Sequence, residues 1–206
     1  MPYASTSEFK GWLRLASGDT VDDVEVALAL SAAERSINTH CGRHFDKTVA
    51  TASPATARLF TATHADLLEV DDFWTATGLV VETRTSSDGA WTTWAAADYQ
   101  AEPLNGIQDG VSGWPTHRLR AVLSKTFPVE HGLATVRVTA KWGWDAVPGD
   151  VKLATHLQAA LLLKRREAPN GLLEFAGDGT SLRVSPIDGH VMRLLQPYVR
   201  TSRIIT

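Results

Sequence analysis

Two histidines and a cysteine lie close together in the first quarter of the chain and have the residue types of a metal site. His40 and His44 are four residues apart, a spacing that places two side chains on one helix face, as some zinc sites require. A structural zinc needs about four ligands, and neither a CxxC pair nor a further histidine cluster supplies the rest. Gly42 should also interrupt the helix between the histidines. We therefore predict no metal site and assign Cys41 to the core.

Three other segments resemble catalytic or cofactor motifs only in part. Gly177 and Gly179 lack the third glycine of a dinucleotide-binding turn and the lysine of a phosphate-binding loop. Ser112 is flanked by glycines as in a serine elbow, but the second glycine comes one residue early. Asp71 and Asp72 should lie at a strand end or turn and, as strand neighbours, point to opposite faces. We predict no catalytic residue, no cofactor and no enzymatic activity.

The composition is that of a folded, globular chain. Of 206 residues, 44% are hydrophobic and 21% are charged, and the net charge of -3 shows no overall basic excess of the kind expected in a nucleic-acid binder. One cysteine excludes an internal disulfide. The sequence has neither an 18-residue apolar run nor a signal-like start, so we expect a soluble protein that is assembled in the cytoplasm and does not enter a membrane.

Two helices are predicted before residue 46. Ser5 and Glu8 form a capping box ahead of a short first helix. The second helix should end at Gly42. Its apolar residues step by three or four, which predicts one buried face; they are Val21, Val24, Leu28, Ala32, Ala33, Ile37 and Cys41.

A long helix and a short one are predicted near the end of the chain. Val151 to Glu167 contains no Gly or Pro and follows Pro148, which suits a first helical turn. Its Leu and Ala residues surround most of the helix, more than one flank of a small bundle can cover. Leu157, Leu161 and Leu163 are therefore candidate subunit-interface residues. The segment around 177–179 should be irregular, and Asp188 lies near the positive end of the last helix.

The middle of the chain has the texture of antiparallel strands, with short β-branched or alternating runs between Gly, Pro, Asn and Asp. A hairpin turn is expected at 87–89, and a long loop at 103–115. The predicted strands are 57–61, 67–70, 79–84, 91–94, 99–102, 118–124 and 135–142. We thus expect an α+β protein: a bundle of about four helices, built from 1–46 and 142–206, with an antiparallel β module inserted at 47–141.

The β region is rich in tryptophan, and Trp91, Trp94, Trp114, Trp142 and Trp144 lie in or beside it. Trp142 and Trp144 would share one face of a continuing strand, as a packing pair where the insertion meets the helices or as part of a subunit interface. Exposed tryptophans would favour an alternative function, a β-rich module that binds glycans or proteins. Lys164, Arg165 and Arg166 oppose the negative end of the long helix. Contact with an acidic partner or with phosphates is the functional alternative.

Three segments together resemble the head-to-tail connector (adaptor) proteins of long-tailed bacteriophages. The first runs from Ala33 to Phe45 and contains Cys41-Gly42-Arg43-x-Phe45. The second runs from Trp142 to Gly171 and contains Val147-Pro148, Val151-Lys152 and the basic triplet. The third is Leu194-Leu195-x-Pro197-Tyr198. The large β insertion departs from compact members of this family and resembles the longer versions in phages of actinobacteria.

The resemblance implies a structural subunit of the virion neck, without catalysis. It implies a ring, typically of twelve copies, between the portal protein and the next tail-proximal neck protein. Double-stranded DNA would pass through this ring without sequence recognition. The segment after the last helix is a candidate for docking onto the portal by adding a strand to its sheet edge, with a frayed terminus as the alternative; its residues are Tyr198, Arg200, Arg203, Ile204 and Ile205.

Overall fold

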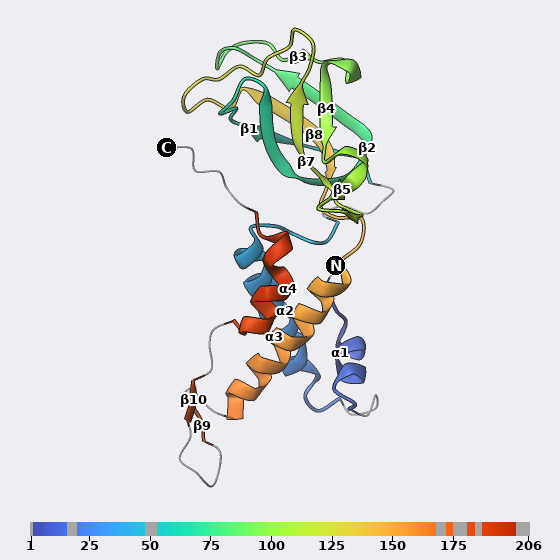
Figure 1. The fold of residues 1–206 in the computed structure, drawn as a ribbon, viewed down its shortest axis with the longest axis vertical. Helices are drawn as coiled ribbons and strands as arrows, with labels where there is room; N and C mark the ends of the chain where they lie inside the picture. Colours follow the sequence, from blue (N-terminus) through green and yellow to red (C-terminus); the bar gives the residue numbers. More distant parts are fainter. Residues whose placement is uncertain are drawn as a thin grey trace. The chain divides into compact units, whose positions relative to one another are not determined.

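A computed structural model describes residues 2–15, 20–47, 53–167, 172–174, 181–183 and 187–200. The chain divides into two compact units, which are described separately (Figure 1). Unit 1 comprises Met1–Phe45 and Val147–Thr206, and unit 2 comprises Asp46–Ala146. Helices build the first unit and an antiparallel sheet builds the second, so the α+β class is confirmed.

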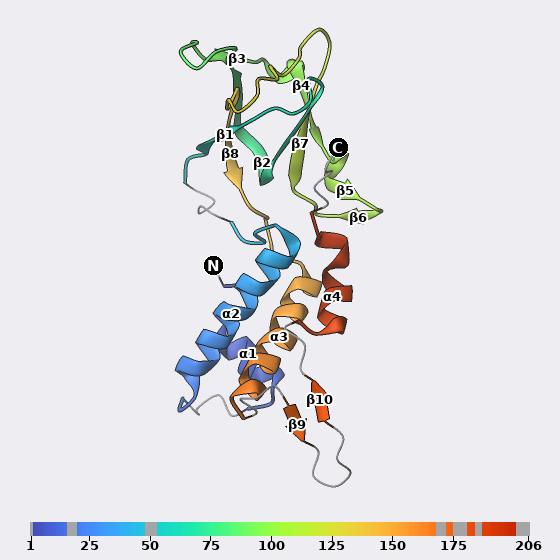
Figure 2. The same ribbon diagram turned by 90° about the vertical axis from the view of Figure 1, so that its left-hand side faces the viewer.

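Unit 1 contains four α-helices, the number that the sequence predicts. They are α1 (Thr6–Trp12), α2 (Asp23–Cys41), α3 (Gly149–Glu167) and α4 (Gly189–Leu195), followed by a 3-10 turn, η3 (Gln196–Tyr198). Within the unit, α3 packs against α2 on one flank and against α4 on the other (Figure 2). A short antiparallel hairpin, β9 (Leu172–Glu174) with β10 (Ser181–Arg183), lies in the segment that we expected to be irregular.

The helix ends follow the sequence signals. Ser5 caps α1: its Oγ accepts a hydrogen bond from the Glu8 amide at 3.1 Å, while the Ser5 amide donates to the Glu8 carboxylate at 2.8 Å. Gly42 ends α2 in the left-handed conformation, with φ at 62°. Asp188, which we placed near the positive end of the last helix, is the N-cap of α4 and accepts from the amide of His190 at 2.7 Å.

The predicted apolar face of α2 is wrong in its first half. The helix buries Val26 and Leu30, and then Ala33, Ile37 and Cys41, against the rest of unit 1. Three side chains that we expected to join them are instead exposed: Val21 by 88%, Val24 by 73% and Leu28 by 64%. Because the helix turns about 100° per residue, residues two apart lie on nearly opposite sides. Two apolar rows therefore follow this segment, and the described residues of unit 1 cover only the row that contains Val26 and Leu30.

Unit 2 is built on a sheet whose strand order is β1-β8-β2-β7-β4, with β3 pairing with β2 at one end. All of its pairings are antiparallel. The strands are β1 (Thr56–Phe60), β2 (Leu67–Thr83), β3 (Thr92–Thr93), β4 (Tyr99–Glu102), β7 (Thr116–Ala121) and β8 (Val136–Trp142). Two short 3-10 turns, η1 (Ala96–Asp98) and η2 (Leu104–Gly106), flank β4.

Strand β2 replaces the two separate strands that we predicted. It pairs with β7 through its first part and with β8 through its second part, with register shifts between Glu69 and Phe73 and between Thr75 and Val80. Such irregularities let a strand bend and tolerate polar residues in its middle. Asp71 and Asp72 therefore lie inside a strand, and their predicted position at a strand end is wrong.

The loop at 103–115 contains more structure than we predicted. A small hairpin, β5 (Ile107–Gln108) with β6 (Val111–Ser112), is closed by Asp109 and Gly110, which both have positive φ. Two consecutive positive φ angles are the requirement of a tight hairpin turn. Trp114 follows the hairpin and is buried.

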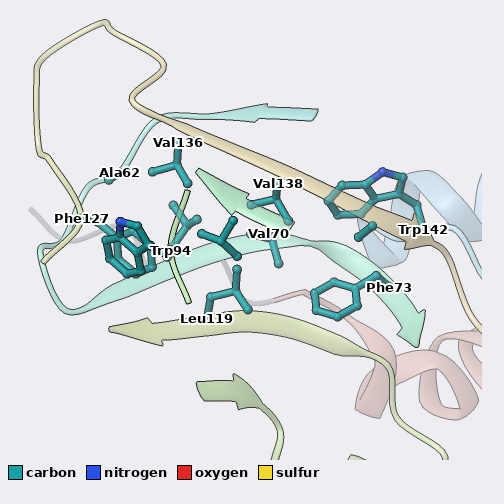
Figure 3. Packing of buried hydrophobic residues seen from close by; sticks show 12 residues of the cluster. Ala62, Val70, Phe73, Trp94, Leu119, Phe127, Val136, Val138 and Trp142 are labelled. Atoms are coloured by element: carbon teal, nitrogen blue, oxygen red, sulfur yellow. The ribbon is translucent and has the colours of Figure 1, made fainter. Parts of the chain in front are cut away.

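The core of unit 2 lies on one face of the sheet (Figure 3). Its aromatic residues pack in pairs: Trp94 stacks on Phe127 with ring centroids 4.8 Å apart, and Phe73 meets Trp142 edge to face at 6.1 Å. Valine and leucine side chains fill the space between them, including Val70, Leu119, Val136 and Val138. This packing makes unit 2 a well-filled module with its own interior.

Candidate assembly interfaces

The groups that we considered for chemistry do not converge. The His44 Nδ1 atom lies 3.2 Å from the amide nitrogen of Asn38, and burial raises the pKa of the Cys41 thiol to about 11. Asp71 pairs with Arg58 at 2.6 Å, while Asp72 accepts from the indole of Trp144. In the described segments, no three His, Cys, Asp or Glu side chains are grouped to hold a metal ion. None of the described helices combines the length and apolar character that would let it cross a bilayer.

The end of α2 holds the segment that follows α4. The buried Arg43 donates from Nε to the carbonyl oxygen of Tyr198 at 2.9 Å, and the amide of Arg200 donates to the carbonyl of Cys41, also at 2.9 Å. We call these four residues the C-terminal anchor. A buried guanidinium that lost its acceptor would be costly, so Arg43 fixes the path of the chain up to Arg200.

Aromatic packing reinforces the C-terminal anchor. The Tyr198 ring meets Phe45 edge to face at 5.7 Å, and its hydroxyl points to Asp150 at 3.4 Å. Burial and the neighbouring Asp150 raise the pKa of Tyr198, which stays neutral. On the other side of Phe45, Tyr3 donates to Asn38 at 2.5 Å and accepts from the Phe45 amide at 2.8 Å. Sequence reasoning did not find this cluster, since its residues come from four distant segments.

The predicted portal-docking residues are only partly within the described chain. Tyr198 is buried and Arg200 is half-buried, both in the C-terminal anchor. Arg203, Ile204 and Ile205 lie outside the described residues. The segment that would dock therefore begins at a fixed point, and the docking itself stays a prediction.

The predicted interface leucines of α3 have intermediate exposure. The helix buries Val151, Ala154 and Ala159 together with the polar Thr155 and Gln158. Leu163 packs against the cluster that α3 forms with α1 and α2. Leu157 and Leu161 form a row with Leu153, each four residues from the next, and Leu153 is 37% exposed.

The basic triplet at the end of α3 is described only at its first member. Lys164 is exposed. This exposure agrees both with a solvated helix end and with contact to an acidic partner. The side chains of Arg165 and Arg166 lie outside the described residues, and their role stays a prediction.

Trp142 and Trp144 are interior residues of unit 2. Strand β8 ends at Trp142, and Gly143, with φ at 98°, turns the chain, so the two rings do not share one strand face as we predicted. The indole of Trp142 donates to the Thr56 carbonyl at 2.9 Å, and Trp144 packs against Trp114 with centroids 5.1 Å apart. As core residues they offer a second subunit no exposed surface in this conformation.

The outer side of the sheet carries paired charges. Arg137 binds Glu82 through two hydrogen bonds of 2.6 and 2.7 Å, and these bonds lower the pKa of Glu82. The guanidinium groups of Arg84 and Arg137 lie 4.6 and 4.7 Å from the centre of the Trp91 ring. A sugar-binding platform needs an open indole face. In unit 2, four tryptophans are buried, and cationic side chains lie over the rings of Trp91 and of the half-buried Trp74. The observed packing therefore gives no support to the glycan-binding alternative.

His156, at the contact between α1 and α3, should make the stability of unit 1 depend on pH. His156 packs against Phe9 and Trp12, with ring centroids 5.7 and 5.5 Å apart. Burial lowers the pKa of His156 below its ordinary value of 6.5; Glu8 opposes this shift and Lys152 adds to it. The unfolded chain therefore binds the proton more readily than the folded chain, and stability that is present above pH 6.5 is lost as the pH falls.

We expect the urea midpoint of the unit 1 transition to fall between about pH 7.5 and 5.5. The His156→Leu variant, which has no proton to bind, should lose most of this slope. The pKa of Glu8 is about 2 in the folded chain and 4.5 ordinarily, so its contribution to the pH dependence of stability falls below pH 5.5. An equal slope in the wild type and the variant would contradict the assignment.

The comparisons with known proteins bear on the fold. No protein-family model matches the chain, and no curated protein matches it. A chain in the neck of an empty GTA (gene transfer agent, phage-like) particle, computed with C6 symmetry, does match: it is 18% identical, with a TM-score of 0.55 over 99% of this chain and 93% of that one.

A chain in the neck of a native GTA particle, computed with C12 symmetry, is also 18% identical, with a TM-score of 0.47 over 88% of this chain and 85% of that one. The first match spans nearly all of both chains, so it includes the inserted β unit as well as the helices. The resemblance to connector proteins is confirmed at the level of fold: this chain has the fold of a neck chain of a phage-like particle.

Proposed function

We propose that this chain is a structural, non-catalytic adaptor subunit in the neck of a phage-like virion, where it joins the portal to the tail. The observation that carries the proposal is the shared fold with a neck chain over almost the full length of both proteins. The three connector-like sequence segments support it independently. The titratable groups of the described chain form scattered pairs, as expected of a protein that assembles without catalysing a reaction.

The subunit works as one copy in a ring around the DNA channel. A closed ring repeats one contact between two different patches around an axis. The matching neck was computed with sixfold symmetry, which rings of six or of twelve copies both satisfy, and twelve is the number that the connector resemblance implies. The net charge of -3 suits a channel through which DNA slides without being held.

The C-terminal segment docks on the portal, and the opposite side of the ring receives the next tail-proximal protein. The C-terminal anchor supports this role, because its hydrogen bonds fix the path of the chain up to Arg200, directly before the segment that docks. The triplet Lys164, Arg165 and Arg166 contacts an acidic neighbour or phosphates. Assembly takes place in the host cytoplasm, and the mature location is the virion neck.

Loss of the chain tests the proposed function. Particles made without it should accumulate as separate heads and tails, because the adaptor that joins them is missing. Negative-stain micrographs should show complete particles again when the wild-type chain is supplied in trans. Normal yields of joined, infectious particles without the chain would contradict an adaptor role.

A further inference from the structure

One row of apolar side chains on α2 is left uncovered within unit 1. Val24 and Leu28 lie two residues from the buried Val26 and Leu30, a rotation of about 200° around the helix. With Val21, which lies in the turn directly before the helix, they form what we call the α2 stripe, and each of the three is more than half exposed. An exposed row of this kind on a regular helix is typical of a surface that another protein covers.

Acidic residues flank the α2 stripe. Asp22, Asp23 and Glu25 lie within the first turn of the helix and beside it, and Asp23 also pairs with Lys10. Glu25 is three residues from Leu28 and four from Val21, so that it borders the stripe directly. The face is therefore apolar at its centre and negative at one end.

The opposite flank of unit 1 presents a complementary face. Helix α4 turns Val191 and Leu195 inward and leaves Met192 40% exposed, with His190 and Arg193 exposed beside it. Helix α3 packs against both α2 and α4, and these two helices lie on different sides of it in Figure 2. We call the surface of His190, Met192 and Arg193 the α4 face. Its exposed apolar residue is Met192, and Arg193 gives it one positive charge, with the exposed Asp188 at the N-cap of the helix.

We propose that the α2 stripe of one copy docks against the α4 face of the next copy. Two different apolar patches, one bordered by Glu25 and the other by Arg193, form a head-to-tail contact, which closes into a ring when the rotation per subunit allows it. Opposite charges at the rim set orientation and disfavour wrong pairings. This inference rests on the proposed function, because the occupant of the stripe is the neighbouring subunit in the same ring.

The test counts copies of the full chain bound to the purified portal ring of the same particle by native mass spectrometry. Lateral contacts make binding cooperative, so the wild type should give mainly empty and fully occupied portals. The variant Val24→Ser with Leu28→Ser should bind with partial occupancies and about tenfold weaker. Leu123→Ser, the same change at an exposed leucine of unit 2, is the matched control and should behave as the wild type.

A charge exchange tests the pairing itself. Glu25→Lys and Arg193→Glu should each weaken cooperative binding by about fivefold, and the two together should restore it, because the opposite charges then face each other again. No restoration by the double variant would overturn the pairing of these faces.

The remaining outcomes separate the inference from the proposed function. Cooperative binding that the serine variant leaves unchanged would overturn the inference alone. Full rings of the variant that no longer recruit the tail would also overturn it, since another neck protein would then cover the stripe. A wild-type chain that does not bind the portal would contradict the proposed function.

Discussion

Replacing Gly143 by alanine is expected to destabilise unit 2 by more than about 3 kcal/mol, because backbone strain and a steric clash act together. Gly143 has φ at 98°, a backbone conformation that residues other than glycine rarely adopt. A Cβ there would also lie far closer than 3.0 Å to the carbonyl oxygen of Asp46. That oxygen belongs to the backbone, and the Gly143 amide is itself held by the Asp72 carbonyl at 2.6 Å, so neither side can give way easily.

Gly110→Ala is the matched control for this variant. Gly110 also has a positive φ, at 80°, but nothing lies within 4 Å of the position that a Cβ would take. Its replacement should cost only the conformational strain, about 1 kcal/mol. Urea unfolding followed by tryptophan fluorescence measures both, because the buried tryptophans report on unit 2. Equal costs at the two positions would show that the approach of residues 46 and 143 is not tight.

Removal of residues 201–206 is expected to weaken portal binding by at least about tenfold, because the docking segment supplies main-chain hydrogen bonds and apolar contacts in the proposed role. The fold should survive, since the cut leaves the hydrogen bonds of the C-terminal anchor in place, including the amide of Arg200 on Cys41. The melting temperature of the truncated chain should therefore match that of the wild type. Head-to-tail joining should fall with portal affinity.

Single substitutions separate strand addition from simple charge attraction. Ile204→Pro removes a backbone donor and should act like the truncation, whereas Ile204→Val keeps the β-branched side chain and the donor and should bind normally. Arg203→Ala should change mainly the salt dependence of binding. Wild-type affinity of the truncated chain for the portal would exclude docking through this segment.

Local signals in the sequence predicted the parts of the fold that depend on neighbouring residues. The capping box of Ser5 and Glu8, the stop at Gly42 and the bounds of β4 at Tyr99–Glu102 are confirmed. Each of these features is decided by hydrogen bonds or backbone angles within a few positions. That residues 47–141 form an inserted domain stays a prediction.

Features that depend on distant contacts were missed. The run from Asp71 to Gly78 reads as a break between two strands, but irregular pairing with β7 and β8 carries β2 through it. Helical periodicity detects apolar rows without telling which row has a partner, and α2 has two. The α2 stripe was therefore assigned to the core although Val26 and Leu30 occupy that place.

For the candidate interfaces too, local patterns were visible in the sequence, whereas contacts between distant residues were not. Leu157 and Leu161 were chosen because the sequence of their helix is apolar on several faces; both side chains have intermediate exposure, and their role in a subunit interface stays a prediction. The C-terminal anchor was not found, since only the folded chain brings Arg43 to the carbonyl of Tyr198. Trp142 was considered for an interface on its residue type alone, and the packing of unit 2 accounts for it fully.

The most direct test of the adaptor role is a cryo-electron microscopy reconstruction of the neck of the mature particle without imposed symmetry. The expected density is a closed ring of identical copies of this chain around the DNA channel, directly beneath the portal, with helical units side by side. A particle in which the chain is present as a single copy, or lies away from the portal vertex, would contradict it.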